Sequence, residues 1–312
     1  MRNAFASEIL GLAEKNDRLF LLSGDIGNRL FNPYKERFPD RFINCGVAEA
    51  NMMSVAAGMA LAGMRPVVYT IAPFATTRCL EQIKIDVCYQ ELPVVIVGVG
   101  AGLSYASLGP THHTLEDLAI LRTLPHMTIV CPGDSWEVRA SLRAALSWEG
   151  PVYLRLGKKG EPEVHADIPH KFAIGKGFPL RKGQGDVCLL SAGNTLPLAM
   201  EVGDILERKG ASPTVVSFHT VKPLDDSLLE NAFASHSLVV TLEEHSRIGG
   251  LGGAVAEWLA DQSDTKARLL RLGIEDLFCP WAGNQEILRS RLGLTAETMA
   301  ESILSQFSRG KH

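Results

Sequence analysis

Short hydrophobic segments alternate along the chain with longer segments of helical composition. In the first half, the short segments are residues 18–24, 65–71, 93–100, 127–133 and 151–157. Their hydrophobicity is continuous rather than alternating, which is typical of strands buried on both faces of a parallel sheet. The helix candidates between them are residues 5–16, 46–63, 77–89 and 135–146. This pattern predicts an α/β fold with a mainly parallel sheet flanked by helices.

The alternation stops after the fifth strand and then resumes. Residues 158–184 are rich in Gly, Pro, His and charge, as linkers are. Further strands are predicted at 186–193, 213–220, 237–244 and 267–273. Helices are predicted between them at 195–209, 227–234 and 252–262. We therefore expect two α/β domains, residues 1–165 and 186–312, joined by a linker at 166–185.

Composition is that of an ordinary globular protein. Of the 312 residues, 46% are hydrophobic and 21% are charged, with a formal net charge of −4 and no basic stripe. We therefore expect no nucleic-acid partner. The sequence also has no apolar run of membrane-spanning length and no signal-peptide pattern at its N-terminus. Its six cysteines lack paired spacing, which predicts core thiols in the cytoplasm, with no membrane association.

Residues 46–63 contain a single charged side chain, Glu49, and only Asn51 and Ser54 are otherwise polar. Apolar residues on every side predict a helix that is buried all round. A carboxylate in such a place is paired with a cation or takes up a proton. A carboxyl group that keeps a proton in a dry cleft can pass it to a ligand. A structural salt bridge, or a favourable place at the helix N-terminus, would equally explain Glu49.

A tight turn at Gly109–Pro110 precedes two adjacent histidines. Thr111 is a good N-cap, so we expect His112 and His113 to open a helix. Imidazoles at a fixed helix start suit proton transfer or anion binding. A zinc site is a weaker alternative, because adjacent histidine side chains diverge and no third ligand is evident nearby.

Three other segments follow strands, where ligands of open α/β sheets bind. Asp25 belongs to the glycine turn 23–28, which either holds a phosphate or is a simple turn. Phe74 comes directly after the second strand, where it either stacks on a planar ligand or packs in the core. For the glycine-rich segment 243–257, close packing between domains or subunits is favoured over anion binding.

The segments 46–74, 108–134, 151–160, 220–225 and 243–257 together resemble the transketolase family of thiamine diphosphate enzymes. They run through nearly the whole chain in the family's order. The resemblance implies the family's pyrimidine-binding domain followed by its C-terminal domain. The GDG…N signature of the diphosphate-binding domain does not occur in the sequence. The chain thus resembles the C-terminal subunit of a split transketolase.

The resemblance also implies a partner and cofactors. A separate N-terminal subunit would hold Mg2+ and the cofactor's diphosphate, in an α2β2 heterotetramer, with no metal ligand in this chain. Glu49 would contact the aminopyrimidine ring of thiamine diphosphate and trigger its activation, and Phe74 would stack on that ring. Asp25 is a further candidate contact to the cofactor.

For the substrate, the resemblance implies a sugar phosphate. His112 matches the histidine that faces the substrate and assists proton movements, and His113 lies beside it in the sequence. Arg155 and Arg2 would bind the phosphate, which an arginine fork suits. Leu108 stands where the family commonly has an aspartate that recognises a sugar hydroxyl. The donor and acceptor sugars therefore stay open, and transfer of a two-carbon ketol unit is the activity we expect.

Two alternatives share the same layout. One is a decarboxylating thiamine enzyme, similar to deoxyxylulose phosphate synthase or to the beta subunit of a 2-oxoacid dehydrogenase. Segments 222–225 and 293–297 fit transketolases and synthases better than dehydrogenases. The other is a non-catalytic regulatory subunit, against which the joint presence of Glu49, Phe74 and His112 argues.

Overall fold

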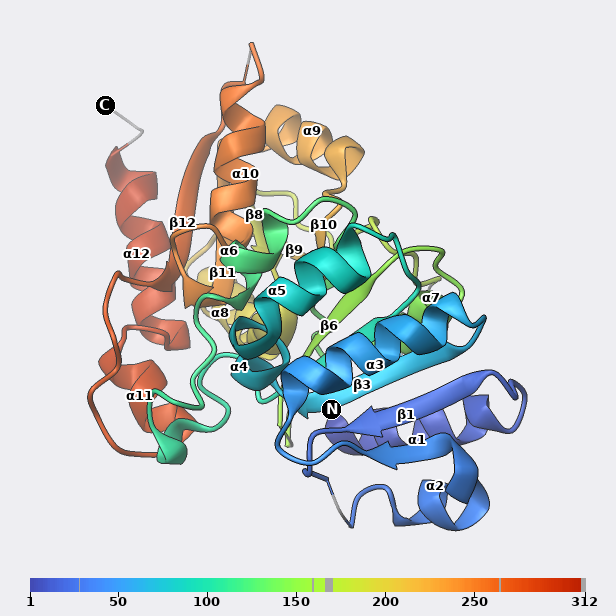
Figure 1. Ribbon diagram of the computed structural model, residues 1–312. Coiled ribbons are helices and arrows are strands. Elements are labelled where there is room, and N and C mark those ends of the chain that lie inside the picture. Colours follow the sequence, from blue (N-terminus) through green and yellow to red (C-terminus); the bar gives the residue numbers. More distant parts are fainter. Residues whose placement is uncertain (28, 159, 166–170, 264, 310–312) are drawn as a thin grey trace.

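Two mainly parallel sheets, each covered by helices, make up the fold (Figure 1). This computed structural model describes residues 1–309 apart from 28, 159, 166–170 and 264. The first sheet has seven strands and the second has five. The α/β fold class predicted from the sequence is therefore confirmed.

The strands of the first sheet are parallel except for the edge strand β10, which pairs antiparallel with β5. Across the sheet the order is β10 (Thr220–Lys222), β5 (Thr128–Val130), β6 (Val152–Leu156), β4 (Val95–Val99), β3 (Arg65–Ile71), β1 (Leu19–Ser23) and β2 (Phe42–Asn44). Helices α1 (Arg2–Ala13) and α7 (Ser135–Leu146) pack on one face. Helices α3 (Glu49–Leu61) and η3 (Ile83–Cys88) pack on the other. Because β10 comes from the second half of the chain, the two halves share a sheet edge.

The second sheet is parallel except for β7, which pairs antiparallel with β9. Its order is β12 (Arg268–Ile274), β11 (Leu238–Ser246), β8 (Val187–Ser191), β9 (Thr214–Ser217) and β7 (Phe178–Arg181). One face carries α8 (Leu196–Arg208), α11 (Gln285–Arg291) and α12 (Ala296–Arg309). The other carries α9 (Asp226–Ser235) and α10 (Leu251–Ala260). Strand β7 lies within the range that we predicted as a linker, and residues 166–170 of that range lie outside the described residues.

Two predicted helices differ from what is observed. Segment 77–89 is divided into η2 (Thr77–Cys79), α5 (Leu80–Gln82) and the π-helical η3. The prediction that His112 and His113 open a helix is wrong, because α6 (Asp117–Arg122) begins later. Residues 110–112 instead form a turn, with the backbone N of His112 3.0 Å from the O of Gly109, and Thr114 then bridges to the O of Gly102 at 3.0 Å. The remaining short elements are α2 (Asn32–Arg37), α4 (Ala72–Ala75), η1 (Pro39–Arg41), η4 (Ala106–Leu108) and η5 (Gly193–Thr195).

Helix α3 buries one face rather than its whole circumference. Met52 and Met53 are fully buried, whereas Leu61 on the opposite side is 68% exposed. The prediction of a helix buried all round is therefore wrong. Hydrophobicity alone does not distinguish a face that packs inside the chain from an apolar face on the surface, and exposed apolar patches commonly mark interaction sites.

A buried cluster of charges ties the segment after β6 to the first domain. Nδ1 of His165 lies 2.8 Å from Oδ2 of Asp134, the N-cap of α7, and its Nε2 lies 3.3 Å from Oε1 of Glu137. Burial lowers the pKa of His165, but hydrogen bonds to the two carboxylates outweigh this and raise it to about 9. Burial alone would raise the pKa of Asp134, but the hydrogen bond from His165 brings it down to about 2. His165 is therefore a cation inside the protein at neutral pH.

The cysteines are free thiols that lie mostly in the core. All six cysteines are free, and five of them are buried, the exception being the half-buried Cys45. Among the described residues, no helix combines the length and the apolar character needed to cross a bilayer.

Candidate active site

The candidate residues gather where the parallel strands of the first sheet end. Glu49 follows β2, Phe74 follows β3, and His112 lies on the long segment after β4. The carboxyl ends of parallel strands meet at one edge of the sheet, so residues far apart in sequence are brought together there. Figure 1 shows the N-terminus of α3 beside α4 at this edge.

Glu49 is the first residue of α3 and is only 2% exposed. Nη1 of Arg78 donates to its Oε2 at 2.8 Å, and Oγ1 of Thr70 donates to its Oε1 at 3.3 Å. A Cβ on Gly24 would lie 3.2 Å from Oε1 and 2.9 Å from Oγ1 of Thr70, so a glycine keeps this side of the carboxylate free. Glu49 is thus paired with a cation, and its place at a helix N-terminus also favours negative charge.

Phe74 and Arg78 form one contact surface with Glu49. Cζ of Arg78 lies 3.8 Å from the centroid of the Phe74 ring, a cation–π contact. The Arg78 side chain is 42% exposed, so the ion pair lies at the solvent side of the buried carboxylate. The sequence reasoning missed Arg78. The two residues lie in separate short elements, α4 and η2, so their spacing in the sequence did not indicate the contact.

His112 lies next to Phe74, as the predicted site requires. The two ring centroids are 5.2 Å apart in an edge-to-face arrangement, and Nδ1 of His112 lies 2.9 Å from Oγ1 of Thr111. On its other side His112 meets Tyr105, with ring centroids 6.3 Å apart, and Nζ of Lys158 lies 4.6 Å from the centroid of Tyr105. Tyr105 and Lys158 were also missed, although Lys158 lies two residues after the end of β6.

Burial lowers the pKa of His112, and electrostatic interactions with His113 and with the charge of Arg78 add to this effect. The lowered pKa favours the neutral ring, which is able to accept a proton. Its Nδ1 already contacts Thr111, which leaves Nε2 for a ligand.

Arg155 lies inside the protein rather than in the site. It is 3% exposed, and its Nε donates to Oδ2 of Asp117 at 2.8 Å. Its Nη2 donates to the backbone oxygens of Thr114 at 2.8 Å and Glu244 at 3.1 Å. The structure contradicts the predicted contact of Arg155 with a sugar phosphate, because these protein acceptors and the burial exclude a ligand.

Among the described residues, the other predicted residues make no hydrogen bond or ring contact with Glu49 or Phe74. His113 is buried, with Nε2 3.3 Å from the backbone oxygen of Ala106, and it lines a separate cavity of about 480 Å³ toward the second domain. Asp25 accepts a hydrogen bond from Asn44 at 2.9 Å in the turn after β1. Arg2 begins α1, and within the described part of the chain its Nε is buried without a hydrogen-bond partner. Asp25 and Arg2 stay predictions.

The glycine-rich segment 243–257 packs the two domains together. Gly249 has a φ of +75°, and a Cβ there would lie 2.5 Å from Cβ of Ala119 on α6. Nη1 of Arg122, also on α6, donates to the backbone oxygen of Gly249 at 2.8 Å. Burial raises the pKa of Glu243 to about 7, against the backbone N–H groups that donate to it at the start of α10. Packing between domains, which we favoured over anion binding, is confirmed.

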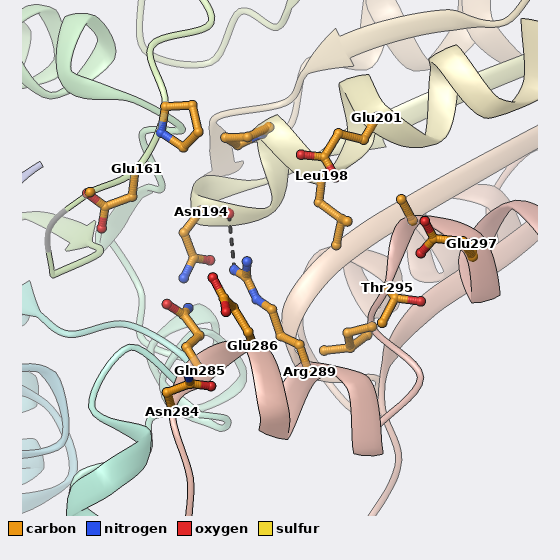
Figure 2. A pocket seen from close by; sticks show the side chains of 15 residues that line it. Glu161, Asn194, Leu198, Glu201, Asn284, Gln285, Glu286, Arg289, Thr295 and Glu297 are labelled. Atoms are coloured by element: carbon orange, nitrogen blue, oxygen red, sulfur yellow. Dashed lines mark hydrogen bonds between the residues drawn. The ribbon is translucent and has the colours of Figure 1, made fainter.

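A cavity of about 530 Å³ lies between α8, α11 and the start of α12 of the second domain and residues 160–162 of the first (Figure 2). Nη2 of Arg289 donates there to the backbone oxygen of Asn194 at 3.2 Å, and its Nε contacts Glu244. None of the residues predicted for the active site lines this cavity.

Comparison with known proteins places both halves of the chain. The pyrimidine-binding domain of transketolase matches residues 1–162, and the C-terminal domain of transketolase matches residues 175–299. A putative transketolase C-terminal section of Methanocaldococcus jannaschii is 35% identical over 99% of this chain and 96% of its own length. One subunit of the apulose-4-phosphate transketolase of Phocaeicola vulgatus is 32% identical over 97% of this chain and 96% of its own.

Two further similarities bear on function. A 1-deoxy-D-xylulose-5-phosphate synthase of Magnetococcus marinus is 37% identical over 96% of this chain, but the match covers only 48% of the synthase. Among solved structures, a split gene transketolase described as an inactive beta4 tetramer superposes with a TM-score of 0.87. It is 35% identical, and the match covers 97% of this chain and 96% of that one.

Proposed function

This chain belongs to the transketolase family, and we propose that it is one subunit of a two-subunit transketolase. The assembled enzyme would move a two-carbon ketol unit between sugar phosphates or related sugars, with thiamine diphosphate and Mg2+ as cofactors. The observation that carries this proposal is the grouping of Glu49, Phe74 and His112 at one sheet edge of the pyrimidine-binding half. We keep the proposed domain division at residues 1–165 and 186–312, with β7 in the linker range between them pairing with the second sheet.

The residues present fit the pyrimidine ring of that cofactor. Glu49 offers a buried carboxyl group, and Phe74 offers a ring face beside it. The planar guanidinium of Arg78 already makes a hydrogen bond to Glu49 and stacks on Phe74. The two side chains can therefore act together on one flat, polar, nitrogen-containing group.

The cofactor, when bound, supplies a centre that stabilises the negative charge left by breaking a carbon–carbon bond. In this chain, Glu49 would hold a proton between its Oε2 and a ring nitrogen, while Thr70 fixes Oε1. Phe74 would orient the ring by stacking. His112, neutral and with Nε2 free of Thr111, would accept a proton from a substrate hydroxyl.

The substrate's anionic end is assigned to cations on the same edge. Arg2 has an uncommitted buried Nε among the described residues, and Lys158 lies over Tyr105 next to His112. We propose that these two replace Arg155 in contacting a phosphate. Leu108 is 51% exposed near His112 and has no hydrogen-bonding group. A sugar hydroxyl at that place would stay unpaired, so we expect a substrate preference that differs from that of enzymes with an aspartate there.

An apolar surface supports assembly with another subunit. Val47, two residues before α3, is 77% exposed, and Leu61, the last residue of α3, is 68% exposed. Tyr89, directly after η3, is 77% exposed. Exposed apolar residues of this kind commonly mark subunit contacts. We propose a diphosphate-binding partner subunit that holds Mg2+, in an α2β2 heterotetramer. The six free thiols suit the reducing cytoplasm.

Reconstitution tests this function. The chain is mixed with the diphosphate-binding subunit, thiamine diphosphate and Mg2+, and ketol transfer between sugar phosphates is measured. Glu49→Gln should lower kcat about 100-fold or more, the range of proton-transfer catalysis, whereas the exposed acid variant Glu14→Gln should not change it. Full activity of the chain alone would contradict the two-subunit claim, and normal turnover of Glu49→Gln would remove Glu49 from the mechanism.

A decarboxylating activity is the second candidate, because the synthase of Magnetococcus marinus is as similar to this chain as the transketolase subunits are. Release of carbon dioxide from pyruvate by the reconstituted pair, without ketol transfer between sugars, would favour that activity. Equal stability of the pair with and without thiamine diphosphate would instead indicate a non-catalytic subunit.

A further inference from the structure

Arg78 occupies the centre of the proposed cofactor site. Its Nη1 donates to Oε2 of Glu49 at 2.8 Å, and its Cζ lies 3.8 Å from the centroid of Phe74. These are the two contacts that we assign to the cofactor's aminopyrimidine, which would hydrogen-bond to the carboxyl group and stack on the ring. A guanidinium is also flat and rich in N–H donors, and it stacks on aromatic faces. The two groups cannot hold the same place at once.

We propose that Arg78 is an internal competitor of the cofactor, whose guanidinium fills the pyrimidine position in the free subunit and leaves it when the cofactor binds. This inference rests on the proposed function. It makes Arg78 a determinant of cofactor affinity rather than a catalytic residue.

The exposure of the two partners shows which of them can move. The Arg78 side chain is 42% exposed, so water can solvate the guanidinium once it swings away. Glu49 is 2% exposed at the start of α3 and cannot follow. Leaving a buried carboxylate without a partner is strongly unfavourable. The closed pair is therefore favoured in the free subunit, and the open arrangement becomes dominant when another group takes over the contact to Glu49, as the pyrimidine ring would.

The pKa of His112 also depends on the position of Arg78. Its charge contributes to the lowered pKa of His112, after burial and the interaction with His113. Removing the guanidinium should therefore move the titration of His112 upward in the free subunit. This change can be followed without cofactor, partner or turnover.

If Arg78 supported cofactor binding instead of competing with it, its removal would change cofactor affinity in the opposite direction. If Arg78 instead stayed in place and held Glu49 ready for the cofactor, its removal would weaken cofactor binding. If it competes, its removal strengthens binding. A guanidinium that fills the site about 90% of the time leaves about a tenth of the molecules competent, and so weakens apparent affinity about tenfold.

The test measures the dissociation constant of thiamine diphosphate for the assembled enzyme in Mg2+ by calorimetry. Arg78→Gln should bind about tenfold more tightly than the wild type. Arg78→Lys, which keeps the charge but not the flat fork, should fall between them. Arg37→Gln, which removes another exposed arginine from an ion pair with Glu14, is the matched control and should not change affinity. Unchanged or weaker binding by Arg78→Gln overturns the proposal, provided that its thermal unfolding matches that of the wild type.

Two more measurements separate this inference from the function on which it rests. Phe74→Ala should weaken cofactor binding at least tenfold, about 1.4 kcal/mol. A loss in Phe74→Ala without a gain in Arg78→Gln would leave the function standing and overturn the competition. Unchanged affinity in Phe74→Ala and Glu49→Ala would remove the cofactor site itself. In the free subunit, NMR titration should show a higher pKa for His112 in Arg78→Gln than in the wild type, and an identical pKa would contradict the placement of Arg78.

Discussion

The buried pair of His165 and Asp134 allows a stability change to be worked out from the structure. Replacing His165 by Gln keeps hydrogen-bonding capacity near Asp134 but removes the positive charge. The folded pKa of His165 is about 9, against about 6.5 for an unperturbed histidine. This difference corresponds to about 3 kcal/mol in favour of the folded state, since one pKa unit is about 1.4 kcal/mol.

The sign of the pH dependence follows from the raised pKa. Stabilisation by His165 is fully present below the unfolded pKa of about 6.5 and is lost as the pH rises through about 9. The pKa of Asp134, lowered to about 2, reports the same contact, so the two contributions are not added. The lowered pKa of Asp134 predicts a second loss of folding stability on the acid side, as the pH falls from about 3.9 toward 2.

Urea unfolding of the wild type and His165→Gln at pH 6 and pH 10 measures this effect. We expect the variant to be less stable by about 3 kcal/mol at pH 6 and by under about 1 kcal/mol at pH 10. His126→Gln is the control, since His126 is half exposed and forms a surface pair with Glu91 at 3.6 Å; its effect should stay under about 1 kcal/mol. The same loss at both pH values would show that His165 stabilises by packing on Trp136 rather than by charge.

Two further predictions concern the domain contact and the proposed proton acceptor. Gly249→Ala should destabilise the chain by about 2–4 kcal/mol in urea unfolding, because its Cβ would meet Ala119 at 2.5 Å from a left-handed backbone. Gly11→Ala in α1, where a Cβ meets nothing within 4 Å, should instead stabilise by up to about 1 kcal/mol, and equal effects would contradict the close contact. His112→Gln should lower kcat of the reconstituted enzyme about 100-fold, and NMR titration of the wild type should show a pKa of His112 below its ordinary value; normal turnover would contradict its role.

Local patterns predicted the strands that form the body of each sheet. The continuous apolar run at 65–71 coincides with β3, and residues 135–146, capped by Asp134, coincide with α7. The short strands β7 and β10 escaped prediction because their partners lie elsewhere in the chain, β9 for one and β5 for the other. Three or four residues carry too little periodicity to indicate a strand by themselves.

Site residues were predicted where their own segment of sequence carried the signal, and were missed where the signal was a contact between distant segments. Phe74 and His112 lie together as the resemblance implied. The pairing of Arg78 with Glu49 joins residues 29 apart in sequence, and no local rule indicates it. Arg155 was misplaced because it lies within β6 and packs against Asp117, whereas Lys158 lies beyond the strand end. A strand residue and a post-strand residue look alike in sequence but face different surroundings.

The central claim is that Glu49 activates thiamine diphosphate in an enzyme shared with a partner subunit. Proton NMR in D2O measures this most directly, as the rate at which the cofactor's thiazolium C2 proton exchanges with solvent. With chain and partner together, exchange should be at least about 100-fold faster than with either alone, and Glu49→Gln should abolish that gain. Equally fast exchange with Glu49→Gln, or with the partner alone, would contradict the account.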